Sequence, residues 1–159
     1  VQANHGSRDG LTISGVPVGK HMREDLVHPR ETGSIIVVIA TDAPLLPHQL
    51  NRLARRGSIG IGRGGTSGGH YSGDIFLAFS TANKQANPWH APDVMELRAL
   101  NDAHLDSFYT AAVQATEEAV VNAMIAAETR IAVKPAGKRV SAIDHARLLE
   151  LVGEKGRGQ

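Results

Sequence analysis

The chain has 159 residues and carries 17 lysines and arginines against 16 aspartates and glutamates, which gives a formal net charge of +1. This balance and the dispersed basic residues leave no electrostatic case for nucleic acid as a partner. No cysteine is present, so disulfides, thiol catalysis and thiolate metal sites are excluded, and a serine must carry any covalent chemistry.

The length fits one domain, and an apolar content of 42% is enough to build a core. No stretch of eighteen apolar residues is present, so the sequence predicts no membrane segment. No leader with a basic start and an apolar middle is visible, and the compartment stays open.

The first six residues are typical of a strand end that turns into a loop, and Asn4 is their candidate functional residue. A side-chain amide near a nucleophile can donate to a developing oxyanion, whereas the alternative is a turn asparagine before a glycine. Residues 11–14 and 16–18 are predicted to form short strand pieces. The polar stretch 20–32 has little apolar periodicity, which predicts an exposed linker.

Residues 33–41, Gly-Ser-Ile-Ile-Val-Val-Ile-Ala-Thr, predict a strand with a hydroxyl at its first position. The apolar run is β-branched and continuous rather than alternating, so both faces of the strand are expected to be covered. Ser34 would lie at the rim, where a rigid mount meets solvent, as a nucleophile requires. A polar linker that leads into Gly33 and Ser34 predicts a processing site between them.

Apolar residues at helical spacing between Leu50 and Ile61 predict a helix that packs on the sheet. Eight glycines lie between residues 57 and 73. They lack the lysine of a phosphate-binding loop and lead into a strand, so nucleotide binding is disfavoured. We expect these glycines to allow close backbone approach or positive φ beside an active site.

Ser72 and Asp74 stand at the start of a second apolar run, residues 75–79, which is predicted to be another buried strand. On an extended segment, side chains two residues apart point the same way. The hydroxyl can pass on a hydrogen bond while the carboxylate holds a positive charge, which suits the orientation of a free α-amine. An ordinary turn is the alternative interpretation of both residues.

The second half of the chain is expected to be structural. Residues 83–92 form a polar loop with the only tryptophan, Trp89, for which a lid and an oligomer contact are both open. A helix over 102–128 is predicted from a stripe of apolar and small residues, which are Leu105, Phe108, Ala112, Ala115, Ala119 and Ala123. A last helix is expected to begin after Ser141 and to end before Gly153. The eight histidines form no metal-binding motif, so no metal is predicted.

Several blocks in this order resemble the L-aminopeptidase D-Ala-esterase/amidase family, which includes the β-peptidyl aminopeptidases. The blocks are residues 33–44, Leu50, residues 52–56, Ser72-Gly73-Asp74 and Phe79-Ser80. The resemblance runs from Val1 to about Val152 and implies an α+β fold, a four-layer αββα sandwich like that of N-terminal-nucleophile hydrolases. Because family precursors are much longer, the chain resembles their C-terminal portion, with residues 1–33 ending the upstream subunit and 34–159 forming the nucleophile-bearing one.

The resemblance also implies a mechanism. The precursor would cut itself between Gly33 and Ser34, and the α-amine of the freed serine, with an ordinary pKa of about 7.7 to 8.0, would be the general base. The resemblance places an oxyanion donor at Asn4 and catalytic support at Ser72 and Asp74. N-terminal amino acids would leave peptides, amides or esters through an acyl-enzyme, with L-, D- or β-amino-acid preference left open. The expected partners are the upstream segment, a small substrate and further copies of the chain, without a cofactor.

Two other functions stay open at this point. A Ser-His-Asp hydrolase would use Ser34 with His5 or His70 and with Asp74, but no Gly-x-Ser-x-Gly elbow surrounds the serine. A non-catalytic scaffold would have a cleft that is incomplete without the upstream segment.

Overall fold

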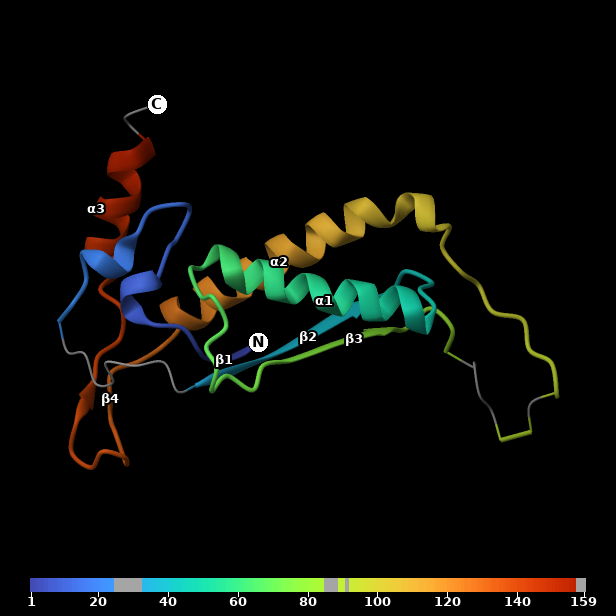
Figure 1. Ribbon diagram of the computed structural model, residues 1–159, viewed down its shortest axis with the longest axis horizontal. Helices are drawn as coiled ribbons and strands as arrows, with labels where there is room; N and C mark the ends of the chain where they lie inside the picture. The colour runs from blue at the N-terminus through green and yellow to red at the C-terminus, as the bar shows by residue number, and fades with distance from the viewer. Residues whose placement is uncertain (25–32, 85–88, 91, 157–159) are drawn as a thin grey trace.

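The computed structural model of the chain describes residues 1–24, 33–84, 89–90 and 92–156. In these ranges the strands are β1 (Gln2–Asn4), β2 (Ser34–Thr41), β3 (Ile75–Ser80), β4 (Arg130–Ile131) and β5 (Arg139–Val140). The α-helices are α1 (Pro47–Arg63), α2 (Leu105–Ile125) and α3 (His145–Gly156), and short 3-10 helices are η1 (Arg8–Gly10), η2 (Val18–Lys20) and η3 (Asp102–His104). The chain is drawn in Figure 1.

One three-stranded sheet, with the strand order β1-β2-β3, forms the centre of the molecule. Strand β1 runs antiparallel to β2 and pairs Asn4 with Ser34. Strand β3 runs parallel to β2, from the pair of Ile36 and Ile75 onward. Parallel neighbours need a crossover, and α1 makes it between β2 and β3. Because the two long strands are parallel, the residues just before each of them lie at the same end of the sheet.

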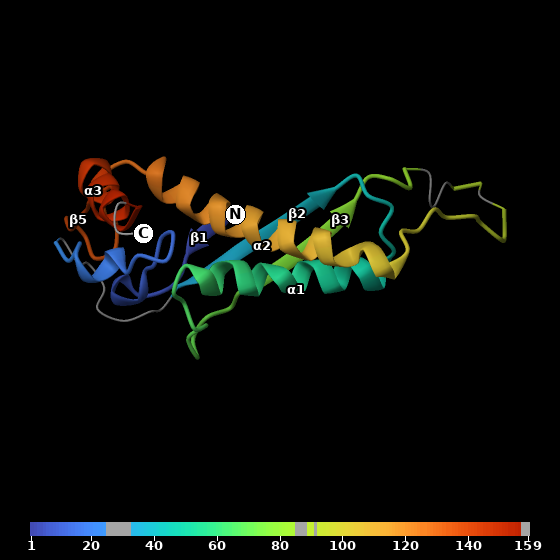
Figure 2. The same cartoon turned by 90° about the horizontal axis from the view of Figure 1, so that it is seen from above.

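Helices α1 and α2 lie side by side over one face of the sheet, as Figures 1 and 2 show. Beneath them the core includes Ile35 and Val37 of β2, which are 0% and 2% exposed, and Ile61 and Val120 from the two helices. The predicted strand over 33–41 and the predicted helix packed on it are therefore present. Burial of these branched side chains is the main force that holds the helical layer on the sheet.

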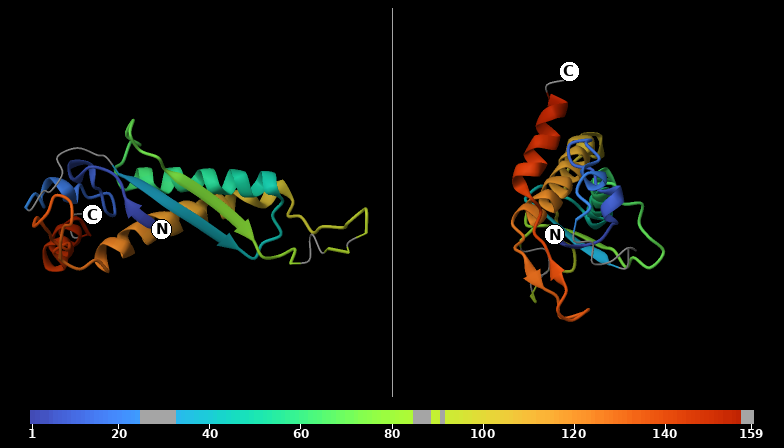
Figure 3. Two further views of the ribbon diagram at one scale, coloured as in Figure 1. Left: turned by 90° about the horizontal axis from the view of Figure 1, so that it is seen from below. Right: turned by 90° about the vertical axis from the view of Figure 1, so that its left-hand side faces the viewer.

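The other face of the sheet is not covered by any described element, which Figure 3 (left) shows from below. Ile36 and Val38 on β2 are 40% and 51% exposed, and Ile75, Leu77 and Phe79 on β3 are exposed as well. The expectation that both strands are buried on both faces is therefore wrong for this chain. The continuous apolar run does suit a strand covered on both sides, but the described residues cover one side only.

The predicted glycine segment is divided between a helix and a loop. Gly57 and Gly60 lie inside α1, where an added Cβ would stand 2.6 Å from the Phe76 ring and 2.6 Å from Thr116, respectively. These glycines thus let α1 approach the sheet and α2 closely, away from the site. Positive φ occurs further on, at Gly65 and Gly68, with values of 98° and 70°.

Three further expectations need correction. Residues 11–18 form only one isolated bridge, between Ile13 and Val16, because the chain turns into η2 at Val18. The buried residues of α2 are Leu105, Ala112, Thr116 and Val120, whereas Ala115 and Ala123 are exposed, because the buried stripe follows the contact with α1.

The third correction is that α3 continues through Gly153 to Gly156. Part of the predicted linker, residues 25–32, and part of the predicted loop, residues 85–88 and 91, lie outside the described residues. Trp89 itself is exposed. Among the described residues, no helix is long and apolar enough to cross a membrane.

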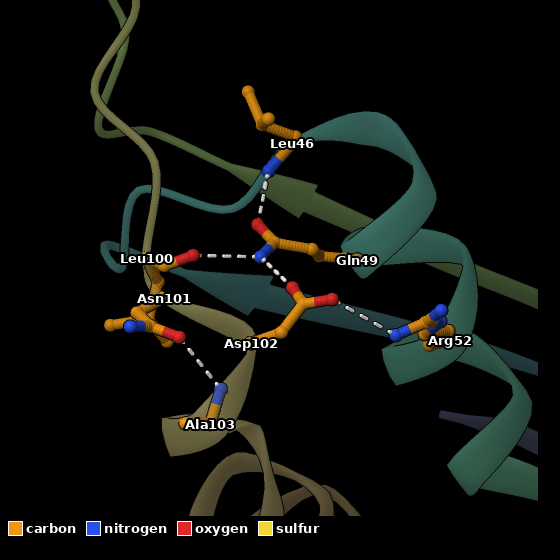
Figure 4. Close-up of polar contacts among 7 residues, drawn as sticks. All are labelled: Leu46, Gln49, Arg52, Leu100, Asn101, Asp102 and Ala103. Carbon is orange, nitrogen blue, oxygen red and sulfur yellow. Dashed lines mark hydrogen bonds and ion pairs between the residues drawn. The ribbon is translucent and has the colours of Figure 1, made fainter.

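A buried glutamine ties the starts of α1 and α2 together, as Figure 4 shows. Gln49 is 1% exposed, and its Nε2 donates to the carbonyl oxygen of Leu100 at 2.8 Å and to Oδ1 of Asp102 at 2.6 Å. Its Oε1 accepts a hydrogen bond from the backbone N–H of Leu46 at 2.9 Å. Arg52 pairs with the second carboxylate oxygen at 3.3 Å. The Gln49 hydrogen bond, followed by the charge of Arg52, lowers the pKa of Asp102 below its ordinary value.

Candidate active site

Ser34 is the first residue of β2, and its half-buried side chain meets the loop that leads into β3. The backbone N–H of Gly73 donates a hydrogen bond to Ser34 Oγ, with a distance of 2.9 Å between the two heavy atoms. The loop reaches the serine because parallel pairing begins at Ile36 and Ile75, which places the residues before both strands next to each other. The hydroxyl therefore has a fixed backbone donor on one side.

Asp74 binds β2 at Ile35, the residue after Ser34. Its Oδ1 accepts a hydrogen bond from the backbone N–H of Ile35 at 3.0 Å and another from Ser72 Oγ. A carboxylate with two donors is held firmly, because charge-assisted hydrogen bonds are stronger than neutral ones. Ser72, Gly73 and Asp74 thus form a bracket, which we call the 72–74 bracket, around the start of β2.

Asn4 approaches the site from the opposite side, because β1 pairs it with Ser34. A Cβ added to Gly33 would lie 1.7 Å from the carbonyl oxygen of Asn4 and 3.0 Å from its side-chain Cγ. Only a glycine fits beside Asn4 at this point, since real Cβ contacts are never so short. The exposed side chain of Asn4 therefore lies next to the residue whose carbonyl would be attacked in self-cleavage.

The structure thus brings together the five residues that the resemblance places at the site, Asn4, Gly33, Ser34, Ser72 and Asp74. Gly73 was not singled out as a functional residue, because a backbone N–H has no sequence signature of its own. The only available signal was its place between two candidate residues.

One histidine proposed for a triad has a different neighbour. Of the two histidines named for that triad, it is His70 that packs edge-on against Tyr71, with ring centroids 5.0 Å apart, and within the described chain its ring makes no hydrogen bond to Ser34. Among the described residues, no group of three histidines, aspartates or glutamates could hold a metal ion. The chemistry that the arrangement supports is that of a hydroxyl nucleophile with fixed polar neighbours.

A cavity of about 540 Å³ adjoins the site beyond Asn4. Its walls come from the N-terminal segment 3–8, from the end of α2 at Met124 and from the segment 141–144. Ser34, Ser72 and Asp74 do not line it, so it neighbours the nucleophile without containing it.

Residues 1–136 match the profile of peptidase family S58. The chain is 42% identical over 163 residues to the beta-peptidyl aminopeptidase BapA of Sphingosinicella microcystinivorans, and this alignment covers 93% of the chain and 40% of the relative. A second beta-peptidyl aminopeptidase BapA, from Sphingosinicella xenopeptidilytica, is 37% identical, again with 40% of its length covered. The chain therefore spans well under half of the length of these relatives.

Solved structures show the same relationship. The L-aminopeptidase D-Ala-esterase/amidase from Ochrobactrum anthropi, a prototype for the serine aminopeptidases with a variant of the Ntn hydrolase fold, matches with a TM-score of 0.87 and 55% identity over 98% of this chain and 42% of its own. A Burkholderia sp. beta-aminopeptidase matches with a TM-score of 0.82 and 42% identity, over 98% and 43% of the two chains. The family resemblance and the α+β fold of the N-terminal-nucleophile type are thus confirmed.

Proposed function

Because this chain belongs to peptidase family S58, we propose that it carries the nucleophile of a self-processing serine hydrolase that releases N-terminal amino acids. The relatives with this fold include an aminopeptidase with esterase and amidase activity and a beta-aminopeptidase. The observation that carries the proposal is the 72–74 bracket around Ser34, which stands directly after Gly33 at the start of a core strand.

The first step is self-cleavage. Ser34 Oγ attacks the carbonyl carbon of Gly33, the C–N bond breaks, and the acyl group passes from nitrogen to oxygen as an ester. Water then hydrolyses the ester, which leaves a carboxylate on Gly33 and a free α-amine on Ser34. Two features support this step: no side chain on Gly33 obstructs the approach, and the Asn4 side chain lies beside that residue, where its amide can donate to the oxyanion.

In the mature enzyme the α-amine of Ser34 acts as the general base for its own hydroxyl, since its ordinary pKa of about 7.7 to 8.0 leaves a useful neutral fraction near neutral pH. The serine forms an acyl-enzyme with the N-terminal residue of the substrate, and water releases that residue. Asn4 stabilises the oxyanion, while Ser72 and Asp74 orient the amine. The hydrogen bond from Ile35 N–H to Asp74 supports this role, because it holds the carboxylate within one residue of that amine.

Two observations support the proposed partners: the chain covers 40% of the length of its relatives, and the described residues leave one face of the sheet exposed. Residues 1–33 would end the upstream subunit and residues 34–159 would form the nucleophile-bearing one, within a single domain. An upstream segment of the same precursor would pack on the exposed apolar side chains of β2 and β3, which would complete the four layers. The assembled enzyme would be a homo-oligomer that acts on small peptides, aminoacyl amides or esters.

The test is to express this chain together with its upstream segment and to measure the intact mass. We expect two pieces, one that ends at Gly33 and one that comprises residues 34–159, together with release of amino acids from aminoacyl amides. Ser34→Ala should stay uncut and inactive with its fold retained, because the rest of β2 still packs, while the matched variant Ser67→Ala in the exposed loop should be cut and active. An active protein with an intact 33–34 bond would falsify the mechanism, and a cut protein without activity would favour the scaffold.

A further inference from the structure

Gly73 is the residue of the 72–74 bracket that faces the nucleophile with its backbone. Its N–H donates to Ser34 Oγ at 2.9 Å. A Cβ added to Gly73 would stand 3.5 Å from the same oxygen, and within the described chain it would meet no other heavy atom within 4 Å apart from its sequence neighbours. Among the described residues, the side of the hydroxyl over Gly73 is therefore open space.

The backbone does not explain why a glycine stands here. Within the part of the chain that the structure describes, the glycines with φ in the left-handed region are Gly6, Gly15, Gly65, Gly68 and Gly137, and Gly73 is not among them. Alanine would thus fit both the backbone and the surrounding protein. What an alanine would change is the space beside the reacting oxygen.

That space lies at the distance at which a substrate must react. A carbonyl carbon approaches a nucleophilic oxygen to about 3 to 3.5 Å in a productive complex, and the missing Cβ lies in the same shell around Oγ. The acyl part of the substrate stays in this shell through both steps, because it remains bonded to Oγ in the acyl-enzyme, whereas the amine or alcohol part departs. A methyl group on residue 73 would therefore compete with the acyl part.

We propose that Gly73 is a specificity-determining residue of this hydrolase: its missing side chain leaves, beside Ser34 Oγ, the space that takes the side chain of the substrate's N-terminal residue. This inference rests on the proposed function and extends it to the size of the acyl group. Substrates whose N-terminal residue carries a side chain should need the space, and glycyl substrates should not.

The experiment compares kcat/KM for leucyl and glycyl p-nitroanilide in wild type and Gly73→Ala. To separate substrate choice from self-cleavage, the protein is made as two co-expressed pieces that include the upstream segment, with the initiator methionine before Ser34 removed. In Gly73→Ala the ratio of kcat/KM for the leucyl substrate to that for the glycyl substrate should fall about 10- to 200-fold, the range for one methylene too many in a pocket.

The matched control is Gly62→Ala on the exposed side of α1, where an added Cβ meets no atom of the described chain within 4 Å. It should leave both rates unchanged. Equal losses on both substrates in Gly73→Ala, or no loss on either, would overturn the specificity role while leaving the proposed function in place. A wild-type protein that releases p-nitroaniline from neither substrate would overturn this role, and one that also fails on D- and β-aminoacyl p-nitroanilides would overturn the proposed function.

Discussion

The two ends of the β2 and β3 strand pair use similar polar residues in opposite ways. At one end Ser72 and Asp74 bind the start of β2, and their hydrogen bonds surround a hydroxyl with open space beside it. At the other end Ser80 donates to the carbonyl oxygen of Ala43, and the buried Gln49 joins α1 to the segment before α2. The second set closes on groups of the protein itself, namely the carbonyl oxygens of Ala43 and Leu100 and the carboxylate of Asp102.

The difference teaches which polar clusters can do chemistry. A cluster whose donors and acceptors are all used inside the protein adds stability and order. A cluster that fixes a nucleophile on one side and leaves its other side open can hold a reacting group. We therefore call the two clusters the Ser34 end and the Gln49 end, and we expect substitutions at the first to change activity and substitutions at the second to change stability.

The largest expected effect is at the Ser34 end. One extra residue placed before a mature Ser34 turns its amine into an amide, which cannot act as a base, so activity should be abolished. His5→Gln and His70→Gln should each retain most activity, measured as kcat/KM on an aminoacyl p-nitroanilide. If the extended enzyme works and a histidine variant is dead, the Ser-His-Asp mechanism replaces the proposed one.

The sequence predicts features that depend on neighbouring residues better than features that depend on contacts between distant segments. Local patterns predict the strand from Ser34 and the helix from Leu50, because β-branched runs and helical spacing are local properties. The same patterns leave Asn4, Ser72 and Asp74 open as turn residues, because their meeting depends on strand pairing between distant segments. Only the resemblance to a known family, carried by several blocks in the same order, predicted that these three residues belong to one site.

Two other features lie beyond sequence reasoning for physical reasons. A continuous apolar run predicts that both faces of β2 are buried, but it does not show which part of the chain buries each face. Ile36 and Val38 are exposed, so the described residues do not bury the second face. Gln49 looks like an ordinary surface residue of a helix start, and only its contacts with Leu100 and Asp102 reveal a buried link.

The second expected effect is a block of self-cleavage. Gly33→Ala places a Cβ where the Asn4 carbonyl oxygen lies, so β1 must shift away from Ser34. The side-chain amide of Asn4 would move away with the strand. The precursor should stay largely uncut in an intact mass measurement. The control Gly153→Ala, whose added Cβ meets none of the described atoms within 4 Å, should be cut like wild type. A fully cut Gly33→Ala protein would remove Asn4 from the cleavage step.

The third prediction compares the carboxylates of the two ends. Asp74→Asn should reduce kcat by roughly 10²- to 10⁴-fold, the range for a general acid–base component, because it removes the charge that orients the amine and keeps the size. Asp102→Asn, the same change at the Gln49 end, should leave kcat near wild type. Wild-type turnover in Asp74→Asn would return this residue to the turn interpretation, and a loss in Asp102→Asn would mean that the two ends are coupled.

The fourth prediction concerns stability alone. Gln49→Leu leaves the N–H of Leu46 and the carbonyl of Leu100 without the partners they have now, so the free energy of unfolding should fall by about 1 to 3 kcal/mol. Urea unfolding measures this loss, and kcat should not change. The exposed Asn51→Ala, which removes one surface hydrogen bond to Arg55, should stay within about 0.5 kcal/mol of wild type. Similar losses in both variants would argue against a special role of the buried link.

The smallest effect is a dependence on pH at the Gln49 end. Hydrogen bonding from Gln49 and the charge of Arg52 lower the pKa of Asp102 below the ordinary 3.8 in the folded state. The unfolded chain therefore takes up the proton first as the pH falls, so the carboxylate stabilises the fold above pH 3.8 and loses this contribution as the pH drops through the folded-state pKa. The side chain is 52% exposed, so solvent screens the interaction and the effect should be modest.

The measurement is urea unfolding of wild type and Asp102→Asn at a series of pH values. Their midpoints should differ most near neutral pH and converge as the pH falls below the folded-state pKa of Asp102, because protonation then removes from wild type the charge that the variant lacks at every pH. A difference that stays constant down to acid pH would mean that the substitution acts through the shape of the Gln49 link and not through the charge. Enzyme activity should be the same in both proteins wherever both are folded, because this end of the strand pair holds no reacting group.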